Sequence, residues 1–211
     1  MDFYTLKKRA SKIVPGLPKY KLAILGDCAT QHLATALRGT ASLNGFALDV
    51  FDADYNQIYE QIIDSQSELY QFTPQSVLLI MCVEKLAASF QCLSDEDRVT
   101  FAENTILMIQ QYWDAISAKT TATVLQYNFA YYNDGVAGNF SLREPTAFVY
   151  QLQKLNYLLS EAAVKHKNVL LVDVNGIQSF YGRNVFRDSK LYYLAEMPFS
   201  LEALPILAQR T

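Results

Sequence analysis

The 211-residue sequence has little of what several large classes of protein require. It contains two histidines, three cysteines and no Cys-x-x-C pair, so neither a Cys/His zinc site nor a disulfide framework is expected. No basic block accompanies the net charge of −3, which makes nucleic acid a poor partner. No apolar run reaches the ~18 residues of a membrane span, and the first residues lack the apolar core of an export signal. We therefore expect a globular, metal-free, cytoplasmic protein that binds neither nucleic acid nor membrane.

Apolar runs and helical patterns alternate along most of the chain. Five runs predict β-strands over residues 21–25, 46–51, 76–83, 122–127 and 168–174. The third and fifth runs are nearly all apolar, which is typical of strands covered on both faces. Helical patterns cover residues 28–43, 94–118 and 141–166. This alternation predicts right-handed crossovers and an α/β fold, a three-layer α/β/α sandwich with a five-stranded parallel sheet in one domain, residues 21–211.

Local signals indicate where several helices begin. Ser94 with Asp97, and Ser141 with Glu144, predict capping boxes at the starts of the second and third helical patterns. Asp188 is expected to cap the short segment that follows it. Two terminal elements complete the prediction: a peripheral helix and turn over residues 1–20, and a last helix over residues 200–210, opened by Ser200.

Polar residues follow each of the five apolar runs. Because ligands of an open parallel sheet bind beyond the carboxyl ends of its strands, these residues are the candidates for a site. They are Gly26, Asp27 and Cys28; Asp52, Asp54, Tyr55 and Asn56; Glu84 and Lys85; Asn128; and Asp173 and Asn175. Such a set is common in α/β proteins. Glu84 and Lys85 have two interpretations, a solvent-facing pair of adjacent charges or groups that orient a substrate.

Cys28 stands where the first run ends and a helical pattern begins. Unpaired N–H groups and the dipole at a helix N-terminus favour the thiolate, which is the nucleophilic form of cysteine. The alternative is a small buried thiol packed beside the sheet. His32, four residues later, could act as a base, or could lie against the sheet or in solvent. His166 ends a long helical pattern and is expected to be structural.

A short strand followed by Gly-Asp-Cys resembles the first block of SGNH/GDSL hydrolases, with Cys28 in place of the usual serine. From about residue 20 to residue 208, the sequence resembles the amino-terminal region of FkbH-like proteins, with the phrases "DYNQI", "SELY" and "MPFS" in that order. In those proteins an SGNH-like (flavodoxin-like) domain precedes a phosphatase domain of the HAD superfamily, subfamily IIIC. The resemblance implies that such a domain follows residue 211. It also implies that Mg²⁺ belongs to that domain, with no cofactor in this one.

The same resemblance implies a function and a set of site residues. FkbH-like proteins are associated with loading a glyceryl unit, derived from a small phosphorylated glycerate, onto an acyl carrier protein through a cysteine thioester. Cys28 matches the nucleophile. The expected oxyanion and substrate site comprises the N–H groups of Cys28 and Ala29, Asn56 and Asn128 as donors, Gly26 and Asp27 in the turn, and Glu84 and Lys85 lining the pocket.

The sequence also departs from the hydrolase pattern. Residues 55–56 replace the glycine of the second block, residues 82–85 replace Gly-x-Asn-Asp of the third, and no histidine follows residue 166. A serine esterase needs a base, whereas a thiol needs less help, so these changes are consistent either with cysteine chemistry or with a decayed site. Three functions remain open: acyl transfer through Cys28, a non-catalytic module that docks substrate or carrier protein, and a GDSL-type esterase with a cysteine nucleophile.

Overall fold

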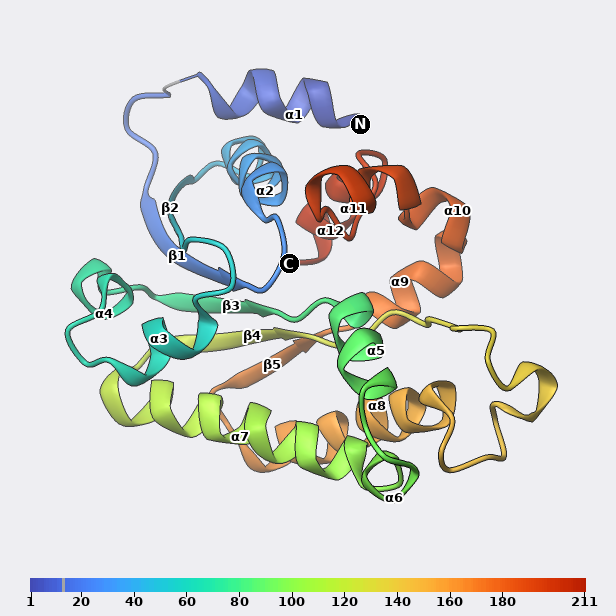
Figure 1. The fold of residues 1–211 in the computed structure, drawn as a ribbon. Helices are drawn as coiled ribbons and strands as arrows, with labels where there is room; N and C mark the ends of the chain where they lie inside the picture. Colours follow the sequence, from blue (N-terminus) through green and yellow to red (C-terminus); the bar gives the residue numbers. More distant parts are fainter. Residues whose placement is uncertain (13) are drawn as a thin grey trace.

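A computed structural model describes residues 1–12 and 14–211 (Figure 1). Five parallel strands form one sheet in the order β2-β1-β3-β4-β5. The strands are β1 (Lys19–Gly26), β2 (Ala47–Asp52), β3 (Ser76–Ile80), β4 (Thr123–Tyr127) and β5 (Val169–Val172). Each of the five apolar runs contributes one strand, so the predicted five-stranded parallel sheet is confirmed.

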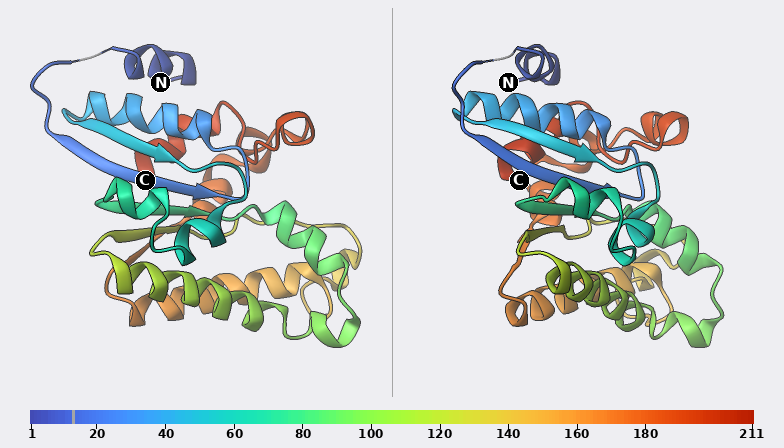
Figure 2. Two further views of the ribbon diagram at one scale, coloured as in Figure 1. Left: turned by 60° about the vertical axis from the view of Figure 1, so that its left-hand side comes forward. Right: turned by 90° about the vertical axis from the view of Figure 1, so that its left-hand side faces the viewer.

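Helices cover both faces of the sheet, which confirms the three-layer α/β/α architecture (Figures 1 and 2). One face is covered by α2 (Gln31–Leu43), α9 (Val174–Tyr181), α10 (Arg183–Phe186) and α12 (Ala203–Arg210), with α1 (Phe3–Ala10) on the outer side of α2. The other packs against α3 (Ile58–Ile63), α4 (Glu68–Phe72), α5 (Val83–Gln91), α7 (Phe101–Lys119) and α8 (Phe148–Lys165). The connections also contain α6 (Asp95–Arg98), α11 (Ser189–Ala195) and the 3₁₀ turn η1 (Gly138–Phe140).

The central strand β3 shows why the sheet has two apolar faces. Its five residues are all buried. Val77 and Leu79 pack against the helices of one face, and Leu78 and Ile80 pack against the helices of the other. Successive side chains of a strand point to opposite faces, so an uninterrupted apolar run supplies both cores.

The predicted peripheral helix is α1, which lies outside α2 (Figure 1). Phe3 and Leu6 are its buried residues. Gly39 of α2 faces the backbone of Leu6 so closely that a Cβ atom would collide with it. Glycine therefore permits the close approach of the two helices.

Two predicted boundaries at the carboxyl edge of the sheet are wrong. Helix α2 begins at Gln31, not at Cys28, and Thr30 occupies the N-cap position. The third strand ends at Ile80, because Cys82 is the N-cap of α5. Cys82 and Val83 extend the apolar run because both are buried at the start of that helix.

The predicted helix caps are partly confirmed. The hydroxyl of Ser94 accepts a hydrogen bond from the N–H of Asp97 at 3.2 Å, although it opens the short α6 and α7 begins later, at Phe101. The capping box at Ser141 and Glu144 is wrong, since α8 begins at Phe148. Glu144 precedes a proline, a position that disfavours helical backbone.

The two caps predicted near the end of the chain are present. Asp188 accepts hydrogen bonds from the N–H groups of Lys190 and Leu191 at the start of α11. Ser200 accepts one from the N–H of Ala203 at 3.1 Å, at the start of α12.

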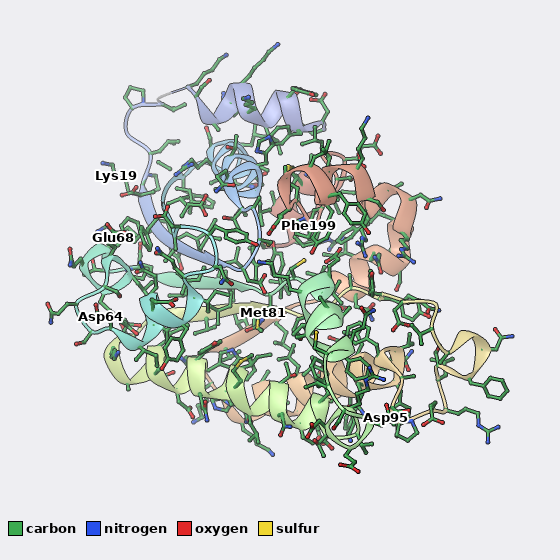
Figure 3. All side chains as sticks on the ribbon, viewed as in Figure 1. Lys19, Asp64, Glu68, Met81, Asp95 and Phe199 are labelled. Atoms are coloured by element: carbon green, nitrogen blue, oxygen red, sulfur yellow. The ribbon has the colours of Figure 1, made fainter. Side chains whose placement is uncertain are left out.

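Charged and apolar side chains are segregated between surface and interior. Lys19, Asp64, Glu68 and Asp95 lie toward the periphery, whereas Met81 and Phe199 point into the middle of the molecule (Figure 3). None of the helices formed by residues 1–12 and 14–211 combines the length and the apolar character that a membrane crossing requires.

Candidate functional site

The candidate site lies where the carboxyl ends of β1 and β3 meet. The connection after β1 leads to β2 on one side of β1, and the connection after β2 leads to β3 on the other side. This reversal of strand order makes the position the switch point where ligands of such sheets bind. Gly26, the last residue of β1, pairs with Ile80, the last residue of β3. Beyond them, a carboxylate oxygen of Asp27 accepts a hydrogen bond from the N–H of Cys82 at 2.7 Å. Asp27 therefore joins the loop after β1 to the start of α5.

Cys28 is buried at this switch point. Its exposed fraction is 2%, and it belongs to the apolar cluster under α2 and α12. A cavity beside it measures about 10 Å³, and the wall of this cavity includes Met197, Pro198 and Phe199. That volume is at the lower limit for a single water molecule. The thiol therefore has no room for an acyl group in this structure.

The environment of Cys28 disfavours the thiolate. Burial raises the pKa of the Cys28 thiol well above its ordinary value, and the neighbouring Cys82 and Asp27 act in the same direction. Because α2 begins at Gln31, Cys28 also lies outside the first helical turn, where the helix dipole acts. The prediction of an ionised, accessible thiol at a helix terminus is therefore wrong for this structure. Of the two interpretations, the buried thiol beside the sheet is the one observed.

A short stretch after α11, residues 196–199, covers Cys28, and we call it the covering segment. The carbonyl oxygen of Glu196 accepts a hydrogen bond from the N–H of Ala29 at 3.0 Å. The expected oxyanion donor at Ala29 is therefore occupied by the protein's own backbone. Glu196 also has a φ of 50°, a left-handed conformation that is uncommon outside glycine.

Lys85 fastens the covering segment to the strand ends. Its ammonium group lies 3.6 Å from the carboxylate of Glu196. The same group donates hydrogen bonds to the hydroxyl of Tyr55 and to the carbonyl oxygen of Asp27. The Tyr55 hydroxyl in turn donates to Glu196. The Lys85 ammonium group is therefore bound by groups of the protein itself, from the loops after β1 and β2 and from the covering segment.

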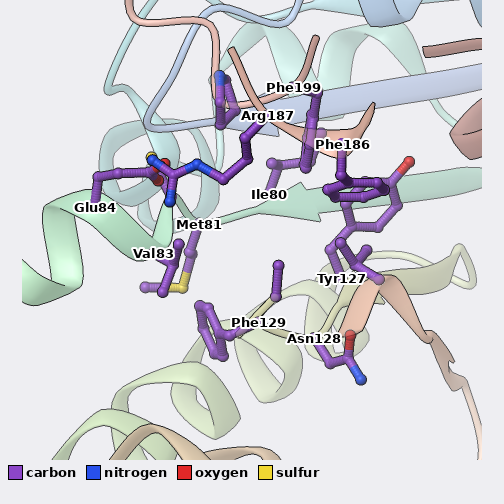
Figure 4. A pocket seen from close by; sticks show the side chains of 14 residues that line it. Ile80, Met81, Val83, Glu84, Tyr127, Asn128, Phe129, Phe186, Arg187 and Phe199 are labelled. Carbon is purple, nitrogen blue, oxygen red and sulfur yellow. The ribbon is translucent and has the colours of Figure 1, made fainter. Parts of the chain in front are cut away.

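Glu84 is buried and paired, so the interpretation as a solvent-facing charge is wrong for this residue. Its carboxylate forms an ion pair with Arg187 and also accepts a hydrogen bond from the Cys82 thiol. The Arg187 guanidinium lies 5.0 Å from the centre of the Tyr132 ring. Figure 4 shows the guanidinium turned toward Glu84 above a cavity of about 20 Å³. The ion pair neutralises the buried charge of Glu84.

The two expected asparagine donors are not directed at Cys28. The Asn128 amide donates to Asp173 at 2.7 Å and accepts from the N–H of Asn175 at 2.9 Å, so it ties β4 to the start of α9. Asn56 is exposed, and its N–H donates to the carbonyl oxygen of Gly26 at 3.2 Å. Its φ of 60° explains why asparagine stands where a hydrolase has glycine, since both residues tolerate this conformation.

Neither histidine is placed as a base for Cys28. His32 is exposed, and its ring stacks on Phe3 with the centroids 5.2 Å apart. It lines the same small cavity as Cys28, but no hydrogen bond joins the two side chains in the described part of the chain. His166 ends α8, and its ring nitrogens contact the carbonyl oxygen of Ala162 and the carboxylate of Asp114, which agrees with a structural role. In residues 1–12 and 14–211, no cluster of His, Cys, Asp and Glu side chains has a metal-binding arrangement.

Sequence reasoning missed Arg187 and Glu196, which complete the site from the far end of the chain. Both come from the segment between α10 and α12, more than 100 residues after Glu84 and Lys85. The local signals there, the Asp188 cap at the start of α11 and the phrase "MPFS" at residues 197–200, indicate neither contact. The pairing of buried charges across this separation depends on the tertiary structure.

The sequence matches the family described as FkbH, N-terminal domain, over residues 21–211. Among solved structures, the chain is similar to the N-terminal part of the protein BF1531 from Bacteroides fragilis, which contains a phosphatase domain and was crystallised with Mg. The TM-score is 0.93 and the identity is 32%, covering 100% of this chain and 55% of that one. The chain thus spans about half the length of this relative. The comparison with curated proteins found no match.

The fold is shared with hydrolases of low sequence identity. A lipase/acylhydrolase from Enterococcus faecalis has a TM-score of 0.60 at 15% identity, with 90% of this chain and 92% of that one covered. TesA has a TM-score of 0.58 at 11% identity, covering 90% and 94%. These likenesses establish the SGNH-hydrolase type of fold predicted from Gly26-Asp27-Cys28.

We expect iodoacetamide to alkylate Cys92 at least tenfold faster than Cys28 or Cys82 in the native protein. Cys92 is exposed, whereas the other two thiols are buried and burial raises their pKa values. Mass spectrometry of peptides at several labelling times measures the three rates, and labelling in urea should make them similar. Fastest labelling at Cys28 would contradict the closed site described above.

The carboxyl of Asp27 should make stability depend on pH. Burial raises its pKa from 3.8 to about 6, so the folded state prefers the protonated acid. Its contribution is present below pH 4 and is lost as the pH rises through 6, a change of about 1.4 kcal/mol between pH 5 and pH 7.5. The Asp27→Asn variant should not lose this contribution. The difference in its free energy of unfolding between pH 7.5 and pH 5 should therefore be more favourable than that of the wild type by the same amount.

Urea unfolding at the two pH values measures this difference. Asp54→Asn is the matched control, because Asp54 is an exposed carboxylate just beyond the next strand. An unchanged pH dependence in Asp27→Asn would show that Asp27 is ionised throughout this range.

Proposed function

Because this chain belongs to the family of FkbH N-terminal domains, we propose that it is a docking module that holds a phosphatase domain of the same protein and receives an acyl carrier protein. The phosphatase domain, of the HAD type, handles a small phosphorylated, glycerate-type substrate together with Mg²⁺. This domain contributes binding and position, and its own SGNH-like site performs no chemistry.

The single observation that carries the proposal is the sealing of Cys28 beneath the covering segment. Nucleophilic catalysis needs an accessible nucleophile, a base in reach and free donors for the oxyanion. Here the thiol is buried and its pKa is raised. The N–H of Ala29 is bonded to Glu196 and the amide of Asn128 is bonded to Asp173. Each group that catalysis would require already has a structural use.

The phosphatase partner is supported by the relative from B. fragilis. That protein contains a phosphatase domain, and this chain covers 55% of its length. The acyl carrier protein and the glycerate-type substrate come from the resemblance to FkbH-like proteins and are part of the proposal.

A second function, acyl transfer through Cys28, is favoured by one feature of the covering segment. The carbonyl oxygen of Glu196 occupies the N–H of Ala29, where the acyl oxygen of a substrate would bind. Displacement of residues 196–199 would free this donor and the thiol together. Cys28 would then lose its proton, attack the acyl carbon of an acyl phosphate and release phosphate. The thiol of the carrier's phosphopantetheine arm would displace Cys28 from the resulting thioester.

Nothing in the site favours the third function, a GDSL-type esterase. Neither histidine is hydrogen-bonded to Cys28 in the described part of the chain, and the cavity beside the thiol is too small for an ester. We do not propose it.

We expect Cys28→Ala and Cys28→Ser to leave turnover of the complete two-domain protein within about twofold of the wild type. The reason is that the thiol contributes packing and no chemistry in the docking function. Formation of loaded carrier protein from a phosphoglycerate donor is the measurement, with Cys92→Ala as the control at an exposed thiol. A loss of tenfold or more in both Cys28 variants, with unchanged thermal unfolding, would reject the docking proposal.

Intact-mass analysis distinguishes the two functions directly. We expect no glyceryl or phosphoglyceryl adduct on Cys28 after the complete protein is incubated with a phosphoglycerate activated as its acyl phosphate, because the thiol is sealed and its pKa is raised. The Cys28→Ala variant is the blank. A glyceryl or phosphoglyceryl adduct that appears in the wild type and is absent from this variant would establish acyl transfer in place of docking.

A further inference from the structure

A largely apolar hollow lies at the edge of the sheet opposite the SGNH-like site. We call it the amino-edge groove, because Ser76 and Thr123, the first residues of β3 and β4, lie in its wall. Its volume is about 420 Å³, compared with about 10 and 20 Å³ for the cavities at the carboxyl edge. It is large enough for several side chains of another segment.

The groove exposes part of the sheet that helices leave uncovered. Leu125 of β4 and Leu170 of β5 lie in its wall, on the face covered elsewhere by α2 and α12. Leu170 is 56% exposed, although strands of parallel sheets are normally covered on both faces. The residues lining the groove include no charged side chain. An apolar surface of this kind favours contact with another apolar segment over contact with water.

The end of α12 places Thr211 in the wall of the groove. The Thr211 hydroxyl is hydrogen-bonded to the hydroxyl of Tyr127 at 2.6 Å, which fixes it against β4. Figure 2 shows the C-terminus of the described chain beside the sheet, toward the ends where the strands begin. A residue joined to Thr211 therefore starts inside the groove.

We propose that the amino-edge groove is the docking site for the first segment of the phosphatase domain that follows Thr211 in the complete protein. This inference rests on the docking function proposed above and identifies the surface that the phosphatase domain would contact. The relative from B. fragilis, which contains a phosphatase domain, supports a further domain of similar size, since 45% of its chain lies outside the part covered here. The segment places apolar side chains on Leu125 and Leu170.

The test uses the complete protein and two leucine variants. Leu170→Asp places a charge in the groove, and Leu107→Asp is the matched control on α7, because Leu107 is 57% exposed and Leu170 is 56% exposed. The readout is the rate of limited proteolysis in the chain just after Thr211. We expect Leu170→Asp to raise that rate at least tenfold and Leu107→Asp to change it less than twofold. The milder Leu170→Ala should raise it about threefold with the thermal unfolding of this domain unchanged.

Two outcomes would overturn the inference. Equal cleavage rates in all variants would show that the segment does not occupy the groove. A wild-type dimer that Leu170→Asp converts to a monomer, as measured by light scattering, would assign the groove to a second copy. Cleavage is independent of Cys28, so a loss of turnover in Cys28→Ala would reject the non-catalytic function and leave the groove assignment standing.

Discussion

The hydrogen bond from the N–H of Cys82 to the carboxylate of Asp27 is the contact on which the rest of the carboxyl edge depends. It joins the chain as it leaves β1 to the N-cap of α5, across the two central strands of the sheet. The bond partly offsets the cost of burying a carboxylate whose pKa is raised to about 6. With these two loops held together, Cys28 is directed into the apolar cluster under α2, and Glu84 is directed toward Arg187.

The same geometry separates this domain from the hydrolases whose fold it shares. A hydrolase of this kind keeps its nucleophile and oxyanion donors free for substrate. Here the carbonyl oxygen of Glu196 occupies the N–H of Ala29, and Met197 to Phe199 complete the wall over the thiol. Lys85 holds the covering segment through its contacts with Glu196 and Tyr55. The groups that would form a catalytic crevice are present, but each is hydrogen-bonded or ion-paired to another group of the protein.

The two edges of the sheet therefore differ in how much accessible surface they offer to a binding partner. The carboxyl edge is closed by its own loops, and the cavities there hold at most one or two water molecules. The amino edge is open, apolar and next to Thr211. In a family whose relative carries a phosphatase domain, this distribution favours a domain that works by contact with its neighbour.

Much of the fold was determined by the sequence alone, because it follows from local and periodic patterns. The five apolar runs supplied both faces of the sheet, and Asp188 and Ser200 capped the helices that follow them. The Gly26-Asp27-Cys28 turn was sufficient to indicate the type of fold. Only the tertiary structure decided the state of the site. Cys28 lies before α2 and not within it, because the helix begins only at Gln31, after Thr30, whose hydroxyl donates to Asp52 at the end of β2. The ion pair of Glu84 with Arg187, and the cover that Glu196 provides, join residues more than 100 positions apart. No local pattern encodes such a contact, since it depends on where the last helices pack against the sheet.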